Sequence, residues 1–314
     1  MQPSGTVTFV FTERDGAVSA VEEAMADPSR PTASFTLDVR AAARDSHAVE
    51  DNDVISPMTA PSPPPPLLEA RNVQKHFGRV VALREGNFTL RPDEVHALVG
   101  DNGAGKSTLI KIISGVFHAD SGEIAIDGRP VTIANPREAR ELGIETVYQD
   151  LALADHLDAS GNLFLGREQL RPPPLSWFGF LDKKAMRRRA QEEMRRLKVG
   201  IQSVDQPVLS LSGGQRQAVA VARAIAWGTR IVIMDEPTAA LGVRESSMVL
   251  ELIKEVRSQG LSIVMISHNL PEVFAVADRI TVLRLGKTIV TLDKSETSLE
   301  AIVGMMTGAL AVAA

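Results

Sequence analysis

The stretch Gly100–Ser107, GDNGAGKS, decides how the chain folds and what it binds. It fits the pattern G-x-x-x-x-G-K-[ST], with the apolar run His96–Val99 before it and a helix-compatible run, Thr108–Ser114, after it. A strand, a glycine-rich turn and a helix in this order let several backbone N–H groups point at phosphate oxygens, beside the positive end of the helix. The stretch therefore predicts a phosphate-binding loop at the carboxyl end of a strand.

Two side chains of this loop point to a nucleotide that carries a magnesium ion. Lys106 can neutralise the β- and γ-phosphates of ATP, and the Ser107 hydroxyl can bind Mg²⁺. A chance match in a glycine-rich turn is the alternative, and the flanking runs argue against it. We therefore predict ATP and Mg²⁺ as cofactors, and we expect these residues to bind the nucleotide: Gly100, Asn102, Gly103, Gly105, Lys106, Ser107 and Thr108.

Two adjacent acids follow a second buried run, Ile231–Met234. Asp235 would stand at the carboxyl end of a strand, where ligands bind in parallel sheets, so it is a candidate magnesium partner. Glu236 is placed to polarise the attacking water as a general base. Two such acids alone would more often be a solvated strand end, and the phosphate loop in the same chain favours the catalytic interpretation.

Apolar runs elsewhere outline a mixed α/β fold. Short strand-like runs fill the chain from Leu67 to Val99, and a further hairpin is expected around Asp127-Gly128. Leu261–Ile266, like the run before Asp235, has the pattern of a strand buried on both faces, and a helix-like segment follows each, which predicts a parallel sheet. The stretch from 136 to 199 has a helix-rich pattern. We expect an ATP-binding domain at 67–307, a helical subdomain at about 150–215 within it, and a short tail at 308–314.

The first 66 residues differ from the rest in charge and pattern. They hold ten acids against four arginines and end in a proline-rich run, whereas the remaining 30 bases and 29 acids nearly balance. This predicts a disordered acidic tail, unless translation begins at Met58; the start lacks the features of a signal peptide. No apolar run approaches the roughly 20 residues of a spanning helix, so a membrane role would need another subunit. The absence of cysteine excludes disulfides and thiolate metal sites.

Three further segments resemble ABC-type ATPases. Leu211–Gln217, LSGGQRQ, resembles the signature motif of that family, Gln149 in VYQD its Q-loop, and His268 in ISHN its switch histidine. The order of these motifs matches the family throughout residues 67–307. The resemblance implies an ABC ATPase core with a parallel sheet, an antiparallel β subdomain and a helical subdomain.

The resemblance also implies a role for each matching residue. It implies catalytic roles for Glu236, His268, Gln149 and Lys106, and metal contacts from Ser107, Gln149 and Asp235. It further implies that Phe77 stacks on adenine and that Ser212, Gly213, Gly214 and Gln215 face the γ-phosphate held by a second copy. Physically, Ser212 can cap a helix whose positive end then faces an anion. A lone aromatic or a lone histidine after a strand would more often be structural.

One segment departs from the family. After Glu236-Pro237-Thr238 the family usually reads Ser-Ala-Leu-Asp, and here Ala239-Ala240-Leu241-Gly242 follows. The acid that normally reaches across the dimer is absent, so cross-talk between the two sites is weaker or is made differently.

The segments ETVYQDLAL (145–153), FLGRE (164–168) and EPTAALGV (236–243) are similar to ATP-binding subunits of monosaccharide importers, and the single module resembles the fructose- or ribose-type members. This implies a peripheral subunit on the cytoplasmic face of the membrane, with transmembrane permease partners and an external or periplasmic sugar-binding protein. The near-neutral body gives no support for a nucleic-acid partner. The alternatives are a DNA-repair or translation-related ABC ATPase and a nucleotide-binding regulator without turnover.

An arginine-rich segment lies within the helix-rich middle. Arg187-Arg188-Arg189 and Arg195-Arg196 interleave with Glu192 and Glu193, which is typical of a solvated helix face. Contact with anionic lipid headgroups is the alternative.

Overall fold

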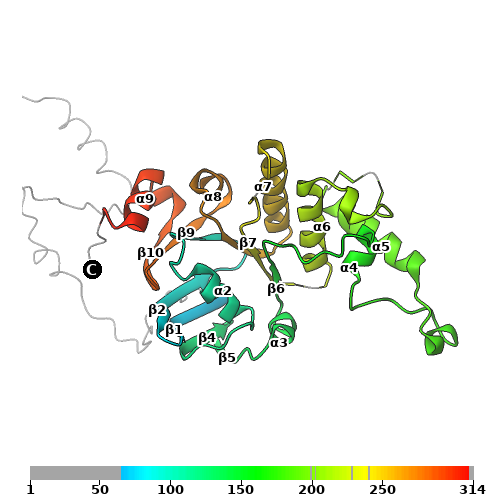
Figure 1. The fold of residues 1–314 in the computed structure, drawn as a ribbon, viewed down its shortest axis with the longest axis horizontal. Helices are drawn as coiled ribbons and strands as arrows, with labels where there is room; N and C mark the ends of the chain where they lie inside the picture. Colours follow the sequence, from blue (N-terminus) through cyan, green and yellow to red (C-terminus); the bar gives the residue numbers. More distant parts are fainter. Residues whose placement is uncertain (1–64, 199, 202, 228, 240, 311–314) are drawn as a thin grey trace, which may run out of the picture. The chain divides into compact units, whose positions relative to one another are not determined.

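The computed structural model describes residues 65–310 except 199, 202, 228 and 240. The predicted acidic tail therefore lies outside the described residues apart from its last two, and the predicted C-terminal tail is described only to residue 310. Within the described ranges, no helix is long and apolar enough to cross a membrane. Figure 1 shows the arrangement of the elements.

The described strands form one sheet in the order β5-β4-β1-β2-β10-β9-β3-β8-β7-β6. Their bounds are β1 (Leu68–Phe77), β2 (Val80–Leu90), β3 (Val95–Val99), β4 (Ser121–Ile126), β5 (Arg129–Val131), β6 (Ile144–Val147), β7 (Ile231–Asp235), β8 (Ser262–Ile266), β9 (Arg279–Arg284) and β10 (Lys287–Asp293). Strand β3 runs parallel to β8 and β9, β8 to β7, and β7 to β6. The prediction of a parallel α/β sheet is confirmed.

The apolar run of β7 shows why the parallel strands lack an alternating pattern. Val232 and Met234 belong to one hydrophobic cluster, with the helices α6 (Gly213–Ile225) and α7 (Val243–Ser258). Ile231 and Ile233 belong to another, with α2 (Lys106–Ile113). Because both faces of the strand are covered, every position from Ile231 to Met234 is apolar.

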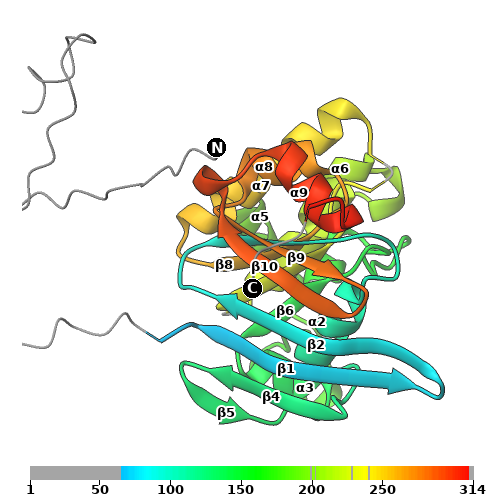
Figure 2. The same ribbon diagram turned by 90° about the vertical axis from the view of Figure 1, so that its left-hand side faces the viewer.

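The remaining strands form an antiparallel layer that continues the sheet. Strand β1 pairs antiparallel with β2 and β4, and β4 pairs with β5. This layer meets the rest of the sheet where Lys287 of β10 pairs with Glu85 of β2. Figure 2 shows the layer with β1, β2, β4 and β5. The antiparallel β subdomain is thus also confirmed.

The helices cover both faces of the sheet, and some of them lie together at one end of the folded domain. Besides α2, α6 and α7 they are α3 (Pro136–Glu141), α4 (Ala159–Leu163), α5 (Lys183–Arg196), α8 (Leu270–Val276) and α9 (Leu299–Thr307). Helices α4, α5 and α6 pack around Phe164, Met186 and Met194 and form a helical subdomain. Helix α6 continues to Ile225, past the expected bound of about 215. The helix-rich prediction for 136–199 is wrong at β6, a four-residue strand whose Glu145 and Thr146 interrupt the apolar pattern.

Candidate nucleotide site

Four neighbouring parallel strands bring the predicted motifs to one edge of the sheet. The phosphate loop follows β3, His268 follows β8, Asp235 ends β7 and Gln149 follows β6. These strands stand side by side in the order β3-β8-β7-β6. Because the carboxyl ends of parallel strands share an edge, the topology alone gathers residues that are far apart in sequence.

The phosphate loop needs its glycines for two different reasons. Gly100, Gly103 and Gly105 all have positive φ angles, of 155°, 79° and 106°. A Cβ atom at Gly100 would also lie 2.1 Å from the Leu283 carbonyl oxygen, and one at Gly105 would lie 2.7 Å from the Ala82 carbonyl oxygen. A Cβ at Gly103 would meet nothing within 4 Å. Two glycines thus permit close backbone contact, and the third only permits the backbone conformation.

The loop leads into α2, and the first backbone N–H groups of that helix lie next to the loop. Gly105 is the N-cap of α2, and no side chain caps this helix among the described residues. The first N–H groups of a helix have no partner within it, so those of Lys106, Ser107 and Thr108 suit an anion. Asn102 and Ser107 are exposed at the mouth of the loop.

Lys106 is buried and lies over the loop. Its Nζ donates to the carbonyl oxygens of Gly100 at 2.6 Å and Asp101 at 3.0 Å. Burial lowers the pKa of Lys106, while the charges of Glu236, Asp101 and Asp235 oppose that shift. The ammonium group therefore stands in the electrostatic range of both predicted catalytic acids.

The two acids after β7 have different environments. Burial and the neighbouring Glu236 raise the pKa of Asp235, and Lys111 and Lys106 partly offset this. A cation near Asp235 would stabilise the charged carboxylate against both effects, and this suits a metal partner.

Glu236 is held in an unusual backbone conformation. Its φ angle is 51°, in the left-handed region, and its N–H donates to the Ile266 carbonyl oxygen of β8 at 2.9 Å. A non-glycine residue there costs on the order of 1 kcal/mol, and such strain often marks functional sites. The carboxylate, 17% exposed, lies 2.7 Å from Nδ1 of His268, which is 66% exposed. The structure thus places the candidate base in contact with the candidate switch histidine.

Gln149 lies exposed in the turn after β6, in a loop that the signature helix holds. Leu151 and Ala152 both have left-handed φ angles, of 56° and 45°. Arg223 of α6 donates to their carbonyl oxygens at 2.9 and 2.7 Å. Sequence analysis missed Arg223; the signal was a single arginine within the alanine- and valine-rich run of α6.

The signature segment begins α6 with a reciprocal cap. The Ser212 hydroxyl accepts from the Gln215 N–H at 3.3 Å, and Gln215 Oε1 accepts from the Ser212 N–H at 3.0 Å. Gln215 Nε2 also donates to the Gly200 carbonyl oxygen at 2.7 Å. The side chain and the N–H of Gln215 are therefore engaged locally, and the N–H groups of Gly213 and Gly214 are the ones that can meet a ligand.

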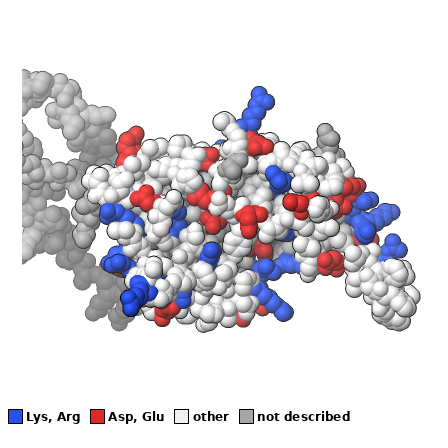
Figure 3. All heavy atoms as spheres, viewed as in Figure 1, with Lys and Arg blue, Asp and Glu red and all other residues white. Residues whose placement is uncertain are grey.

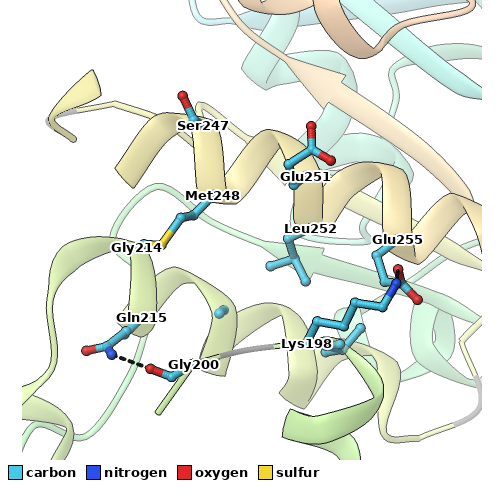
Figure 4. A pocket seen from close by; sticks show the side chains of 11 residues that line it. Lys198, Gly200, Gly214, Gln215, Ser247, Met248, Glu251, Leu252 and Glu255 are labelled. Atoms are coloured by element: carbon cyan, nitrogen blue, oxygen red, sulfur yellow. Dashed lines mark hydrogen bonds and ion pairs between the residues drawn. The ribbon is translucent and has the colours of Figure 1, made fainter. Parts of the chain in front are cut away.

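Gly213 and Gly214 have a packing role that the sequence did not suggest. Cβ atoms there would lie 2.6 Å from Leu241 Cδ2 and 2.9 Å from Met248 Cε. The start of α6 thus packs closely on α7 and the loop before it. Beside it, α6, α7 and residues that follow α5 line an open pocket of about 400 Å³, and two of its lining residues, Lys198 and Glu255, form an ion pair (Figure 4).

No hydrogen bond or ion pair among the described residues joins the signature segment to the phosphate loop. Figure 1 shows α2 and α6 in different layers. Within one chain, the two candidate phosphate-binding surfaces therefore do not form one contact network.

Phe77 ends β1 with its ring 43% exposed. Two side chains lie beside the ring. The Phe117 ring centroid is 5.2 Å away, with 69° between the ring planes, and the Lys75 Nζ lies 5.6 Å from the Phe77 centroid. Phe117, which sequence analysis did not single out, makes a T-shaped contact with the Phe77 ring. The exposed part of Phe77 can meet a planar ligand.

Gly242, which replaces the usual aspartate, is the N-cap of α7. Its φ angle is −72°, so glycine is not needed for the backbone here. The Glu245 carboxylate accepts from the Gly242 N–H at 3.3 Å. The Glu245 side chain thus makes one half of a capping box, and the other half, a bond from the Glu245 N–H to a side chain at 242, is one that glycine cannot make.

We predict a graded effect when the loop glycines are replaced. Gly103→Ala should lower the free energy of unfolding by about 1–2 kcal/mol, because it meets only conformational strain. Gly100→Ala should cost clearly more and abolish ATP binding, because its Cβ would collide with the Leu283 carbonyl. Urea unfolding and nucleotide titration of the two variants measure this. Equal losses in both would contradict the distinction between contact and conformation.

Comparison with known proteins agrees with this geometry. The family model described as ABC transporter matches residues 83–239. The fructose import ATP-binding protein FrcA of Rhizobium meliloti is 52% identical over 246 residues, which cover 78% of this chain and 95% of that protein. The xylose/arabinose import ATP-binding protein XylG of Sulfolobus acidocaldarius is 47% identical and is covered to 94%, with 77% of this chain. The ribose import ATP-binding protein RbsA 2 of Burkholderia pseudomallei is 44% identical over 80% of this chain, which spans 48% of that protein.

Solved structures show the same fold. CbiO1 from Clostridium perfringens, part of the ABC transporter complex cbiONQ, superposes with a TM-score of 0.64 at 25% identity, covering 78% of this chain and 95% of that one. An ATP-binding cassette solved as a dimer in a post-hydrolysis state with ADP and Pi gives a TM-score of 0.60 at 25% identity, covering 72% and 98%. The resemblance found in the motifs is confirmed, and this chain belongs to the ABC transporter family as an ATP-binding cassette.

Proposed function

We propose that this chain binds and hydrolyses ATP to energise the import of a simple sugar. The observation that carries the proposal is the Glu236–His268 contact at the sheet edge that also holds the phosphate loop. Relatives named as fructose and xylose/arabinose import ATP-binding proteins, matched over nearly their whole length, support the transport role.

The chemistry follows from the position of each residue. Lys106 and the N–H groups at the start of α2 hold the β- and γ-phosphates, and Phe77 stacks on the adenine. The Glu236 carboxylate accepts a proton from water as the water oxygen bonds to the γ-phosphorus and the bond to the ADP oxygen breaks. His268, with Nδ1 toward Glu236, keeps its other ring nitrogen for the γ-phosphate and orients the base.

The residues at this edge also fit a magnesium ion that arrives with the nucleotide. The described residues hold no group of three or more His, Asp or Glu that would bind a metal without further ligands. Mg²⁺ in nucleotide sites commonly has only one or two carboxylates, together with phosphates and waters. Asp235, the Ser107 hydroxyl and Gln149 would hold it. When bound, the ion neutralises charge on the β- and γ-phosphate oxygens.

The site is half of a shared one. Ser212, Gly213, Gly214 and Gln215 offer a helix N-terminus that does not contact the phosphate loop of the same chain. In a symmetric pair, this surface of each copy closes over the γ-phosphate held by the other. Solved cassettes of the same fold include a dimer with ADP and Pi bound, which supports this arrangement.

The partners follow from the transport role. A transmembrane permease supplies the pathway, a sugar-binding protein outside the cell or in the periplasm delivers the solute, and this chain sits peripherally on the cytoplasmic face. Nucleic acid is not a partner. Between Gln149 and Ser212 the longest described helix is α5, with 14 residues, and this disfavours the long coiled-coil arm of a DNA-repair ATPase.

Glu236→Gln tests the catalytic assignment. We expect ATP binding to persist and turnover to fall by about 10²–10⁴-fold, because a general base is lost while the phosphate loop stays intact. Size-exclusion chromatography with ATP should then show a trapped dimer. Glu141→Gln, on the exposed face of α3, is the matched control and should leave turnover unchanged. Undiminished hydrolysis in the first variant would refute the role of Glu236.

Co-purification tests the transport assignment. Affinity isolation of the chain from gently solubilised native membranes should recover a multi-spanning membrane protein, because no described helix can span a bilayer itself. Vesicles with that complex should take up a sugar only with ATP. Recovery of the chain with DNA or ribosomes instead would overturn the transport role while leaving the ATPase assignment intact.

A further inference from the structure

A loop between α4 and α5 presents large apolar side chains to solvent. We call residues Leu170–Leu181 the tip; it projects from the helical subdomain in Figure 1 and includes the short helix η1 (Leu175–Phe178). The described chain has four exposed aromatic side chains, and three lie here: Trp177 at 79%, Phe178 at 75% and Phe180 at 54%. Leu170 and Leu175 extend the same apolar surface.

The backbone of the tip is closed by its own hydrogen bonds. The Arg171 N–H donates to the Phe180 carbonyl oxygen at 2.9 Å, and the Asp182 N–H to the Gln169 carbonyl oxygen at 2.7 Å. Across the turn, the Phe180 N–H donates to the Leu175 carbonyl oxygen at 3.3 Å. Each backbone group that is paired internally lowers the cost of entering an apolar medium. The exposed aromatic rings are therefore carried on a folded hairpin.

Cations surround the tip. Residues 166–189 hold seven basic residues against two acids, in a chain whose net charge is −5. Figure 3 shows Lys and Arg side chains gathered beside the uncharged tip at the right of the view. Both acids are engaged locally: Asp182 caps α5 and Glu168 accepts from the Gly166 N–H.

The basic residues divide into two groups. Arg167 and Arg189 lie over the Trp227 ring, at 5.0 and 4.9 Å, and Arg187 pairs with Asp205. Four have no ion pair among the described residues: Arg171, Lys183, Lys184 and Arg188. The solvated-face interpretation of the arginine-rich segment thus fails for Arg189, which packs inward.

We propose that the tip inserts into the interfacial layer of a membrane that contains anionic lipids. Trp177 and Phe178 would lie at the boundary of headgroups and acyl chains, where aromatic side chains concentrate in membrane proteins. The four remaining cations would meet lipid phosphates. This contact goes beyond the proposed function, because it concerns this chain and lipid directly, whatever the permease and the solute.

Lipid fits the tip better than a protein surface does. Protein interface cores are depleted of lysine, and here Lys183 and Lys184 directly adjoin the apolar surface. In a bilayer the long lysine and arginine stems can extend toward headgroups while aromatic rings enter beneath them. A single hairpin tip also offers little area for a stable protein complex.

Vesicle flotation of the full chain tests the proposal. The chain should float with phosphatidylglycerol–phosphatidylcholine vesicles and much less with phosphatidylcholine alone. Brominated lipid should quench the Trp177 emission, obtained by subtracting that of Trp177→Phe. The double variant Trp177→Ser/Phe178→Ser should bind vesicles about tenfold or more weakly, because two large apolar side chains are lost. Its ATPase activity in solution should be unchanged.

The control variant is Val80→Ser/Leu285→Ser, which removes two apolar side chains that are 66% and 70% exposed elsewhere. It should float like the unmodified chain. The proposal would be overturned if the unmodified chain floated with neither kind of vesicle. It would also be overturned if the tip variant floated as well as the unmodified chain, or if brominated lipid did not quench the Trp177 emission. So would cross-linking of residue 177 to a permease or to a second copy without any lipid contact. None of these results would bear on the Glu236 and permease tests.

Discussion

Parallel pairing of β3, β8, β7 and β6 is the constraint on which the rest of the molecule depends. It places the phosphate loop, His268, the acids of β7 and Gln149 at one edge, without requiring them to be close in sequence. The hydrogen bond from the Glu236 N–H to the end of β8 shows how directly the sheet sets the chemistry, because it fixes the carboxylate beside His268. Both faces of β7 are buried, since its side chains pack into two separate hydrophobic clusters.

Much of this could be predicted from the sequence because the motifs are short and local. The glycines and Lys106 of the phosphate loop form one continuous pattern, and an apolar run before Asp235 is enough to predict a buried strand. The Ser212 cap follows from residue types alone, and the structure shows it in reciprocal form with Gln215. The parallel sheet could be predicted from its buried apolar runs, whereas the antiparallel subdomain was expected from the resemblance to ABC-type ATPases. The roles of individual site residues in catalysis remain proposals that the geometry supports.

What the sequence did not predict depends on contacts between distant segments. β6 is too short and too polar to be recognised, and its place at the sheet edge comes from pairing with β7. Arg223 holds the loop of Gln149 through two backbone carbonyls. Every residue has a backbone carbonyl, so the sequence does not reveal these hydrogen bonds. The Glu245 carboxylate binds the Gly242 N–H at the start of α7, and Gly213 leaves room for the Leu241 side chain. The aromatic residues of the tip can be identified in the sequence, but their exposure to solvent is a property of the folded chain.

The central claim is that ATP acts as a clamp between two copies, each supplying half of the site. Mixing two inactive variants tests it most directly. Lys106→Ala removes the phosphate-loop charge, and Ser212→Asp keeps the cap of α6 while placing a negative charge against the phosphate. A mixed dimer would contain one unbroken site, so the mixture should recover about a quarter of the normal turnover when pairing is random. No recovery, with mixed dimers demonstrated by cross-linking, would show that the two motifs do not act across the dimer.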